Sequence, residues 1–264
     1  MPRRPAVHVA TITRATIAIG TVLLAASCGR GGDGGDAAGS FPETREPFEP
    51  TAEMRMTAVA TTDLEAMLDD LSRIEGWHAR ERTGLVPSLR GGVPVTELDA
   101  AEAALGCRFP DDLRALWRWR DGQADPDGTA AFAWYHALLP MHEALAQYRE
   151  LRAMPILGWE ATWLPVLNFQ EEWYFVECRP ERVAASPLMF LFTESGPAPA
   201  YASLTSYFAT MAEAMATGAV THGDGGLDAD EPALAAIHRR RNPGLPFPYF
   251  VADNAADPPT EPTR

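Results

Sequence analysis

The sequence is poor in cysteine and has no cluster of metal ligands. Only three of the 264 residues are cysteine, and no two of them form a Cys-x-x-Cys pair. The six histidines are scattered, and His142-Glu143 starts like a zinc-protease motif but has no second histidine at the required spacing. The sequence therefore predicts neither a metal site nor a cofactor.

Motifs that carry catalysis are missing as well. Ser195 lacks the flanking glycines of a nucleophile elbow, and the Arg-Gly-Gly at residues 90–92 lacks the Lys-Ser/Thr pair of a phosphate-binding loop. Glu171 and Glu172 are adjacent carboxylates, but neighbours in a hairpin point to opposite faces and rarely form an acid–base couple. We therefore expect a binding protein and not an enzyme.

Positive charge is scarce. The chain has a formal net charge of −14 at pH 7, from 36 acidic and 22 basic residues. Such a surface repels the phosphates of nucleic acids and of anionic lipids, and it would suit a basic protein partner. The alternative is that the acidity only keeps the protein soluble. We expect a protein partner, and no nucleic acid.

The N-terminus has an apolar run, residues 15–26, that is too short to span a bilayer as a mature helix. Arginines at positions 3, 4 and 14 precede or flank it, as is typical of a signal peptide. The run ends in Ala-Ala-Ser followed by Cys28, which resembles a bacterial lipobox. This resemblance implies that residues 1–27 are removed and that Cys28 is lipidated.

The expected location follows from this signal. The protein would be exported and anchored to the cell envelope, and its only contact with the membrane would be the lipid. An ordinary cleaved signal peptide, giving a secreted or periplasmic protein, is the alternative. Residues 28–57 are rich in glycine, aspartate and proline and predict a flexible tether.

The rest of the chain is organised around residues 95–122, which predict two short helices joined by a tight corner. Thr96 can cap the first helix, with Asp99 as an acidic variant of the capping box. Gly106 follows Leu105 where a left-handed C-terminal residue belongs.

The second helix is expected to begin just after the corner. Phe109 and Pro110 turn the chain, and proline is favoured at the first position of a helix. Asp111 and Asp112 follow in the first turn, where negative charge suits the helix dipole. Gly122 is expected to end this helix.

This pattern resembles the signature of the SUKH superfamily, the Smi/Knr-type domain named in part for a yeast regulator of cell-wall synthesis. The matching residues are Glu97, Leu98, Glu102, Leu105, Gly106, Phe109, Pro110, Leu116 and Gly122. Each of them also suits a purely structural role, so the resemblance concerns the fold and transfers no binding site.

The resemblance and the hydrophobic pattern agree on an α+β fold. We expect one SUKH-like domain at residues 58–220, in which an antiparallel sheet of about four to six strands packs with N-terminal helices and a C-terminal helix. The expected elements are helices at 64–76, 140–151 and 203–218, strands at 130–136 and 187–193, and a hairpin of 163–169 with 172–178.

Two segments follow the domain. Residues 221–251 end in an aromatic stretch that would be awkward if wholly exposed, so we expect this extension to pack on the domain. Residues 252–264 predict a disordered tail. If Cys28 is lipidated, Cys107 and Cys178 remain; they could pair or be small buried residues, and the sequence does not decide.

The candidate binding residues lie in the predicted hairpin. Trp163, Glu171, Glu172 and Trp173 would place aromatic anchors beside an acidic rim, which suits a basic protein. The resemblance implies a bacterial immunity protein that neutralises a toxin by binding it, although such proteins are expected in the cytoplasm. The alternative is a membrane-anchored envelope scaffold for cell-wall assembly proteins.

Overall fold

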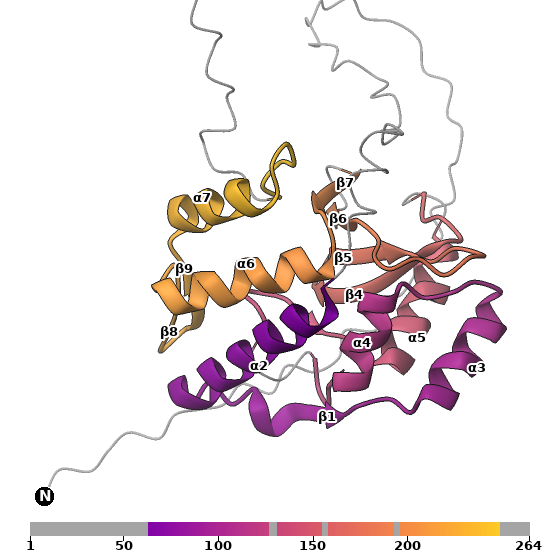
Figure 1. Ribbon diagram of the computed structural model, residues 1–264, viewed down its shortest axis with the longest axis horizontal. Helices are drawn as coiled ribbons and strands as arrows, with labels where there is room; N and C mark the ends of the chain where they lie inside the picture. The colour runs from indigo at the N-terminus through magenta and orange to yellow at the C-terminus, as the bar shows by residue number, and fades with distance from the viewer. Residues whose placement is uncertain (1–62, 127–130, 155–157, 193–195, 249–264) are drawn as a thin grey trace, which may run out of the picture. The chain divides into compact units, whose positions relative to one another are not determined.

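A computed structural model describes residues 63–126, 131–154, 158–192 and 196–248. The expected signal peptide, Cys28, the tether, the first residues of the predicted domain and the predicted tail all lie outside these ranges. The elements, shown in Figure 1, are α2 (Leu64–Glu81), a short 3-10 turn (Val86–Ser88), β1 (Leu89–Gly91), α3 (Val95–Leu105), α4 (Asp111–Trp119), β2 (Arg120–Gln123), β3 (Ala137–Leu138), α5 (Met141–Arg152), β4 (Trp163–Phe169), β5 (Glu172–Glu177), β6 (Leu188–Phe192), β7 (Gly196–Tyr201), α6 (Leu204–Thr217), β8 (Val220–Gly223), β9 (Gly226–Ala229) and α7 (Glu231–Arg241).

A five-stranded antiparallel sheet with the order β3-β4-β5-β6-β7 forms the centre of the fold. The α+β class and the number of strands are as predicted, and the hairpin of β4 and β5 lies within one residue of its expected bounds. Strand β7 was not anticipated, because its sequence, Gly-Pro-Ala-Pro-Ala-Tyr, is poor in strand-forming residues. It pairs with β6 at the edge of the sheet, where proline is tolerated.

Helices cover both faces of the sheet. Consecutive residues of a strand point to opposite faces, and in β5 the Trp173 indole donates to Gln147 of α5, whereas Tyr174 packs against Tyr207 of α6. Helix α5 therefore covers one face and α6 the other. Figure 1 shows α2 alongside α6, and the two helices contact each other along their lengths. No helix within the described ranges has the length and apolar character needed to cross a membrane.

The two signature helices form, with different boundaries from those predicted. Helix α3 ends at Gly106, whose φ of 72° is left-handed as predicted. Thr96 is not its cap, because the helix already begins at Val95 after Pro94. Helix α4 carries the predicted buried stripe of Leu113, Leu116 and Trp117, all fully buried.

The sequence-based prediction that Gly122 ends helix α4 was wrong. The helix stops at Trp119, and Gly122 lies in β2 with a φ of 64°. A Cβ at this position would lie 2.3 Å from the Pro140 nitrogen. The glycine is needed because β2 passes directly against the backbone that leads into α5, and the Asp121 carboxylate accepts the first N–H of α5, from Met141, at 2.8 Å.

Two further predictions differ from the structure. Helix α2 continues through Gly76 to Glu81, since one glycine costs a helix only about 1 kcal/mol when one face is buried. The segment before β3 is not a strand. Its Ala133 and His136 instead face each other across a tight turn, with hydrogen bonds in both directions between their backbones.

The C-terminal extension contains a β8–β9 hairpin and α7, which contacts α6. Asn242, just after α7, accepts the Ala202 N–H at 3.1 Å and the Ser206 hydroxyl at 2.5 Å, so the end of this helix is tied to the start of α6. Phe247 is buried, and its ring stacks on Trp134 with a centroid distance of 6.2 Å.

Candidate functional site

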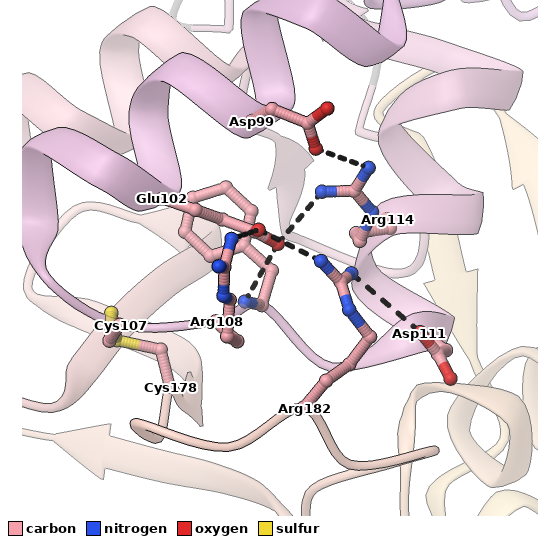
Figure 2. A network of polar contacts seen from close by, with 9 residues as sticks. Asp99, Glu102, Cys107, Arg108, Asp111, Arg114, Cys178 and Arg182 are labelled. Carbon is pink, nitrogen blue, oxygen red and sulfur yellow. Dashed lines mark hydrogen bonds and ion pairs between the residues drawn. A yellow bond between two sulfur atoms is a disulfide. The ribbon is translucent and has the colours of Figure 1, made fainter.

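The corner between α3 and α4 is held by one buried carboxylate. The side chain of Glu102, on the last turns of α3, has no exposed surface. Figure 2 shows the guanidinium groups of Arg108, Arg114 and Arg182 around it. These three groups and the backbone N–H of Phe109 donate to its carboxylate at 2.8 to 3.1 Å. Burial alone would raise the pKa of Glu102, but the hydrogen bonds from Arg114, Arg108 and the Phe109 N–H outweigh it and lower that pKa.

The loop after β5 is joined to this corner. A disulfide connects Cys107 to Cys178, with 5.7 Å between their Cα atoms, which settles the pairing that the sequence left open. The backbones of Arg108 and Arg179 exchange hydrogen bonds beside it, and Arg182 adds its guanidinium to Glu102. With its acceptor positions taken by arginines and a backbone N–H, Glu102 is suited to holding the fold and not to proton transfer.

The structure separates the four predicted binding residues. Glu171 and Glu172 lie at the turn of the β4–β5 hairpin, but Trp163 pairs with Glu177 at the opposite end of that hairpin. The Trp163 ring is partly buried against the Phe175 ring, with 4.7 Å between the ring centroids. Trp173 is also half-buried, on the face that α5 covers. Neither tryptophan therefore accompanies Glu171 as an exposed anchor.

A different aromatic side chain is exposed at this end of the sheet. Tyr135 is 41% exposed and stacks on Phe169, the last residue of β4, with a centroid distance of 5.6 Å. Tyr135 belongs to the Ala133–His136 turn, and Phe169 leads into the Gln170-Glu171 turn, so two tight turns lie against each other. We call this the double-turn surface, and it consists of Tyr135, Phe169, Gln170, Glu171 and Glu172, with the buried Trp134 beneath it.

Both turns hold a non-glycine residue in the left-handed region. Trp134 has a φ of 55° and Gln170 a φ of 52°. Two-residue turns with positive φ at the first central position normally use glycine there. A bulky residue in this conformation costs of order 1 to 3 kcal/mol and is found most often at functional sites. The double-turn surface is thus held in a backbone conformation that local preference opposes.

A buried histidine lies beneath the double-turn surface. The His136 ring is almost completely buried, and its Nε2 lies 3.3 Å from Oε2 of Glu172. Burial lowers the pKa of His136, in spite of the opposing effect of Glu172. His136 is therefore neutral at pH 7 and does not cancel the negative charge of Glu172.

The sequence pointed to Glu171 and Glu172 but contained no signal for the turn that carries Tyr135. Residues 130–136 were expected to form a strand, and a tight turn was not predicted there. Trp134 is buried, and only the turn exposes Tyr135. Among the described residues, no group of three or more His, Cys, Asp or Glu side chains is arranged to hold a metal ion.

The chain matches one family model. Residues 92–210 match the SMI1 / KNR4 family (SUKH-1), a segment that includes the Glu102 corner, the five-stranded sheet and the first half of α6. No curated protein matches this chain. The family match and the antiparallel α+β architecture agree, and by them the chain contains a domain of the SUKH superfamily.

Proposed function

We propose that this protein is a non-enzymatic, exported immunity protein that neutralises a toxin by binding it directly. The observation that carries this proposal is the double-turn surface, which presents the exposed Tyr135 and Glu171, with the partly buried Glu172 beside them, at one end of the SUKH sheet. Tyrosine is one of the residues that supply most of the energy of protein interfaces, and charges around it steer a partner of opposite sign.

The edges of the sheet favour binding through turns over binding by strand addition. Strand β3 has only two residues at one edge. Strand β7, at the other edge, contains Pro197 and Pro199, and neither can donate a backbone hydrogen bond to an added strand. A partner strand would find few unpaired donors at either edge, so the double-turn surface is the better candidate.

Export is supported by a feature independent of the N-terminal sequence. The Cys107–Cys178 disulfide joins two parts of the domain that are 71 residues apart. Structural disulfides form and persist in oxidising compartments and are rare in a reducing cytoplasm. This agrees with removal of residues 1–27, and it favours a toxin that is intercepted outside the inner membrane.

The same feature favours a second candidate, a scaffold for cell-wall assembly proteins. An exported domain cannot reach nucleases and other toxins that act in the cytoplasm, whereas wall-assembly proteins work where a disulfide is stable. The partner would still be a protein, bound by the same surface.

Deleting the gene from the source organism separates the two candidates. An immunity protein predicts that the mutant is killed in mixed culture with its toxin-producing parent and grows normally alone. A scaffold predicts an envelope defect in pure culture and no added killing. Normal growth in both cultures would contradict both functions. The full chain, restored on a plasmid, is the control.

The partner can then be identified by cross-linking. A carbodiimide couples carboxylates of this chain to amines of the partner. The chain contains no lysine, so its side chains cannot couple to one another, and products larger than the chain identify lysines of a partner. A toxin in the coupled product supports immunity, and wall-assembly proteins support the scaffold.

A further inference from the structure

The double-turn surface combines an aromatic ring with carboxylates in a small area. Phe169, which stacks on Tyr135, is the register partner of Glu172 across the hairpin. The Glu172 carboxylate reaches His136, the residue next to Tyr135. Glu171 is exposed at the turn between Phe169 and Glu172. Phe169 is thus a neighbour of both Tyr135 and Glu172, which places an aromatic ring and two carboxylates in one small area.

We propose that the double-turn surface binds an arginine side chain of the partner, with the guanidinium against Tyr135 and its N–H groups directed to the exposed Glu171 and to Oε1 of Glu172, the oxygen that does not face His136. This inference rests on the proposed function, because it specifies how the protein partner is recognised. A guanidinium fits better than an ammonium because it is planar, stacks on aromatic rings and can donate two parallel hydrogen bonds to a carboxylate.

The same arrangement already occurs within this chain. The guanidinium of Arg120 lies over the Trp119 ring at 5.6 Å from its centroid, and its Nη2 donates to Oε1 of Glu75 at 2.7 Å. This combination of aromatic ring, arginine and carboxylate joins β2 to α2. At the double-turn surface the ring and the carboxylates are present, and we infer that the partner supplies the arginine.

Charge and rigidity both favour this occupant. The chain has a net charge of −14, and the neutral His136 leaves the charge of Glu172 uncompensated by that ring. The field of the surface thus attracts a basic protein. The two turns are fixed by backbone hydrogen bonds and by the stacking of Tyr135 on Phe169, so little conformational entropy is lost when the arginine binds.

The probe for this inference is the peptide acetyl-Gly-Arg-Gly-Arg-Gly-amide, titrated into the ¹⁵N-labelled full chain and followed by NMR. We expect saturable shifts of the Tyr135, Gln170 and Glu171 amides. The lysine peptide should bind more weakly, and the citrulline peptide, which is uncharged but has nearly the same shape, should not bind there. Equal binding of the citrulline peptide, or shifts that map to another surface, would overturn the inference.

Variants test the named contacts. Tyr135→Ala and Glu171→Gln should each lower the affinity for the arginine peptide by about two- to fivefold. Glu97→Gln on α3 and Leu68→Ala on α2 are matched controls that remove an exposed carboxylate and an exposed apolar side chain elsewhere, and they should leave binding unchanged. An unchanged spectrum away from the turns shows that each variant is folded. Equal binding by all four variants overturns the inference.

The same variants separate this inference from the proposed function. The partner found by carbodiimide coupling is tested against wild type, Glu171→Arg and the control Glu97→Arg. If all three bind it equally, the double-turn inference is wrong and the protein-binding function stands. If deletion of the gene has no effect in either culture, the proposed function fails, and the peptide titration still decides the inference.

Discussion

Oε1 of the buried Glu102 side chain accepts the backbone N–H of Phe109 at 3.1 Å, across the corner that joins α3 to α4. Both residues belong to the signature that identified the family. Glu102 lies on the last turn of α3, and Phe109 leads into α4, so this hydrogen bond joins the end of the first helix to the start of the second. Burial places the negative charge of Glu102 in a low-dielectric environment. This charge is compensated by Arg108, Arg114 and Arg182.

Replacing Glu102 should be costly. Glu102→Gln removes the charge that three arginines share, and we expect the free energy of unfolding to fall by about 3 kcal/mol, as for a broken buried ion pair. Asp99→Asn is the control, because Asp99 contacts the same Arg114 but its side chain is 54% exposed, and it should cost less than about 1 kcal/mol. Urea denaturation measures both. Equal losses would mean that burial of Glu102 contributes nothing.

Two left-handed glycines of the signature should respond differently to alanine. Gly122→Ala places a Cβ 2.3 Å from the Pro140 nitrogen at a φ of 64°, so we expect a loss above about 3 kcal/mol or no folded protein. Gly106→Ala has a similar φ, 72°, but nothing lies within 4 Å of its Cβ, so only the backbone term of about 1 kcal/mol remains. Thermal unfolding of both variants tests this; similar losses would contradict the close approach of β2 to Pro140.

The disulfide should stabilise the domain through the unfolded chain. A link across 71 residues restricts the unfolded ensemble by about 4 kcal/mol in the chain-entropy model. We expect Cys107→Ser with Cys178→Ser to lose about this much, and reduced wild type to behave like that variant. Cys28→Ser is the control for removing a cysteine outside the pair. It should leave the stability unchanged. If Cys28 is lipidated, as the lipobox resemblance implies, Cys28→Ser should also abolish incorporation of radiolabelled fatty acid.

Asp112 should make stability depend on pH. Burial at the start of α4 raises its pKa from 3.8 to about 7, although its Oδ1 accepts the Leu113 N–H. Between these values the folded chain holds a proton that the unfolded chain releases, so the contribution of Asp112 to the free energy of unfolding falls as pH rises from about 4 to 7. The fall amounts to at most about 4 kcal/mol.

The variant Asp112→Asn isolates this contribution. Burial lowers the pKa of His78 to about 4, so His78 acts in the opposite direction and adds stability as pH rises through that range. Because His78 is present in both proteins, the difference between wild type and Asp112→Asn cancels it. We expect urea unfolding to show the variant gaining on wild type between pH 5 and pH 8. A constant difference would mean that Asp112 is already ionised at pH 5.

Local sequence pattern predicted much of the fold because the relevant forces act over a few residues. The stripe of Leu113, Leu116 and Trp117 needed only helical periodicity, and Ser203 caps α6 by accepting the Ser206 N–H three residues on. The β4–β5 hairpin followed from two β-rich runs separated by a polar pair. The roles of Glu102 and Gly122 in the signature did not follow, because they depend on what approaches them from elsewhere in the chain.

What the sequence by itself determined is the α+β class, the family signature and most of the helices and strands, since each depends on patterns within one segment. Only the tertiary structure decided that Trp163 lies far from the hairpin turn, that Tyr135 is exposed beside Phe169, and that Cys107 pairs with Cys178. These are contacts between segments distant in sequence. The packing of the whole sheet and its helices selects them, and no local preference encodes them: Trp134 and Gln170 are held in left-handed turns against their own preference.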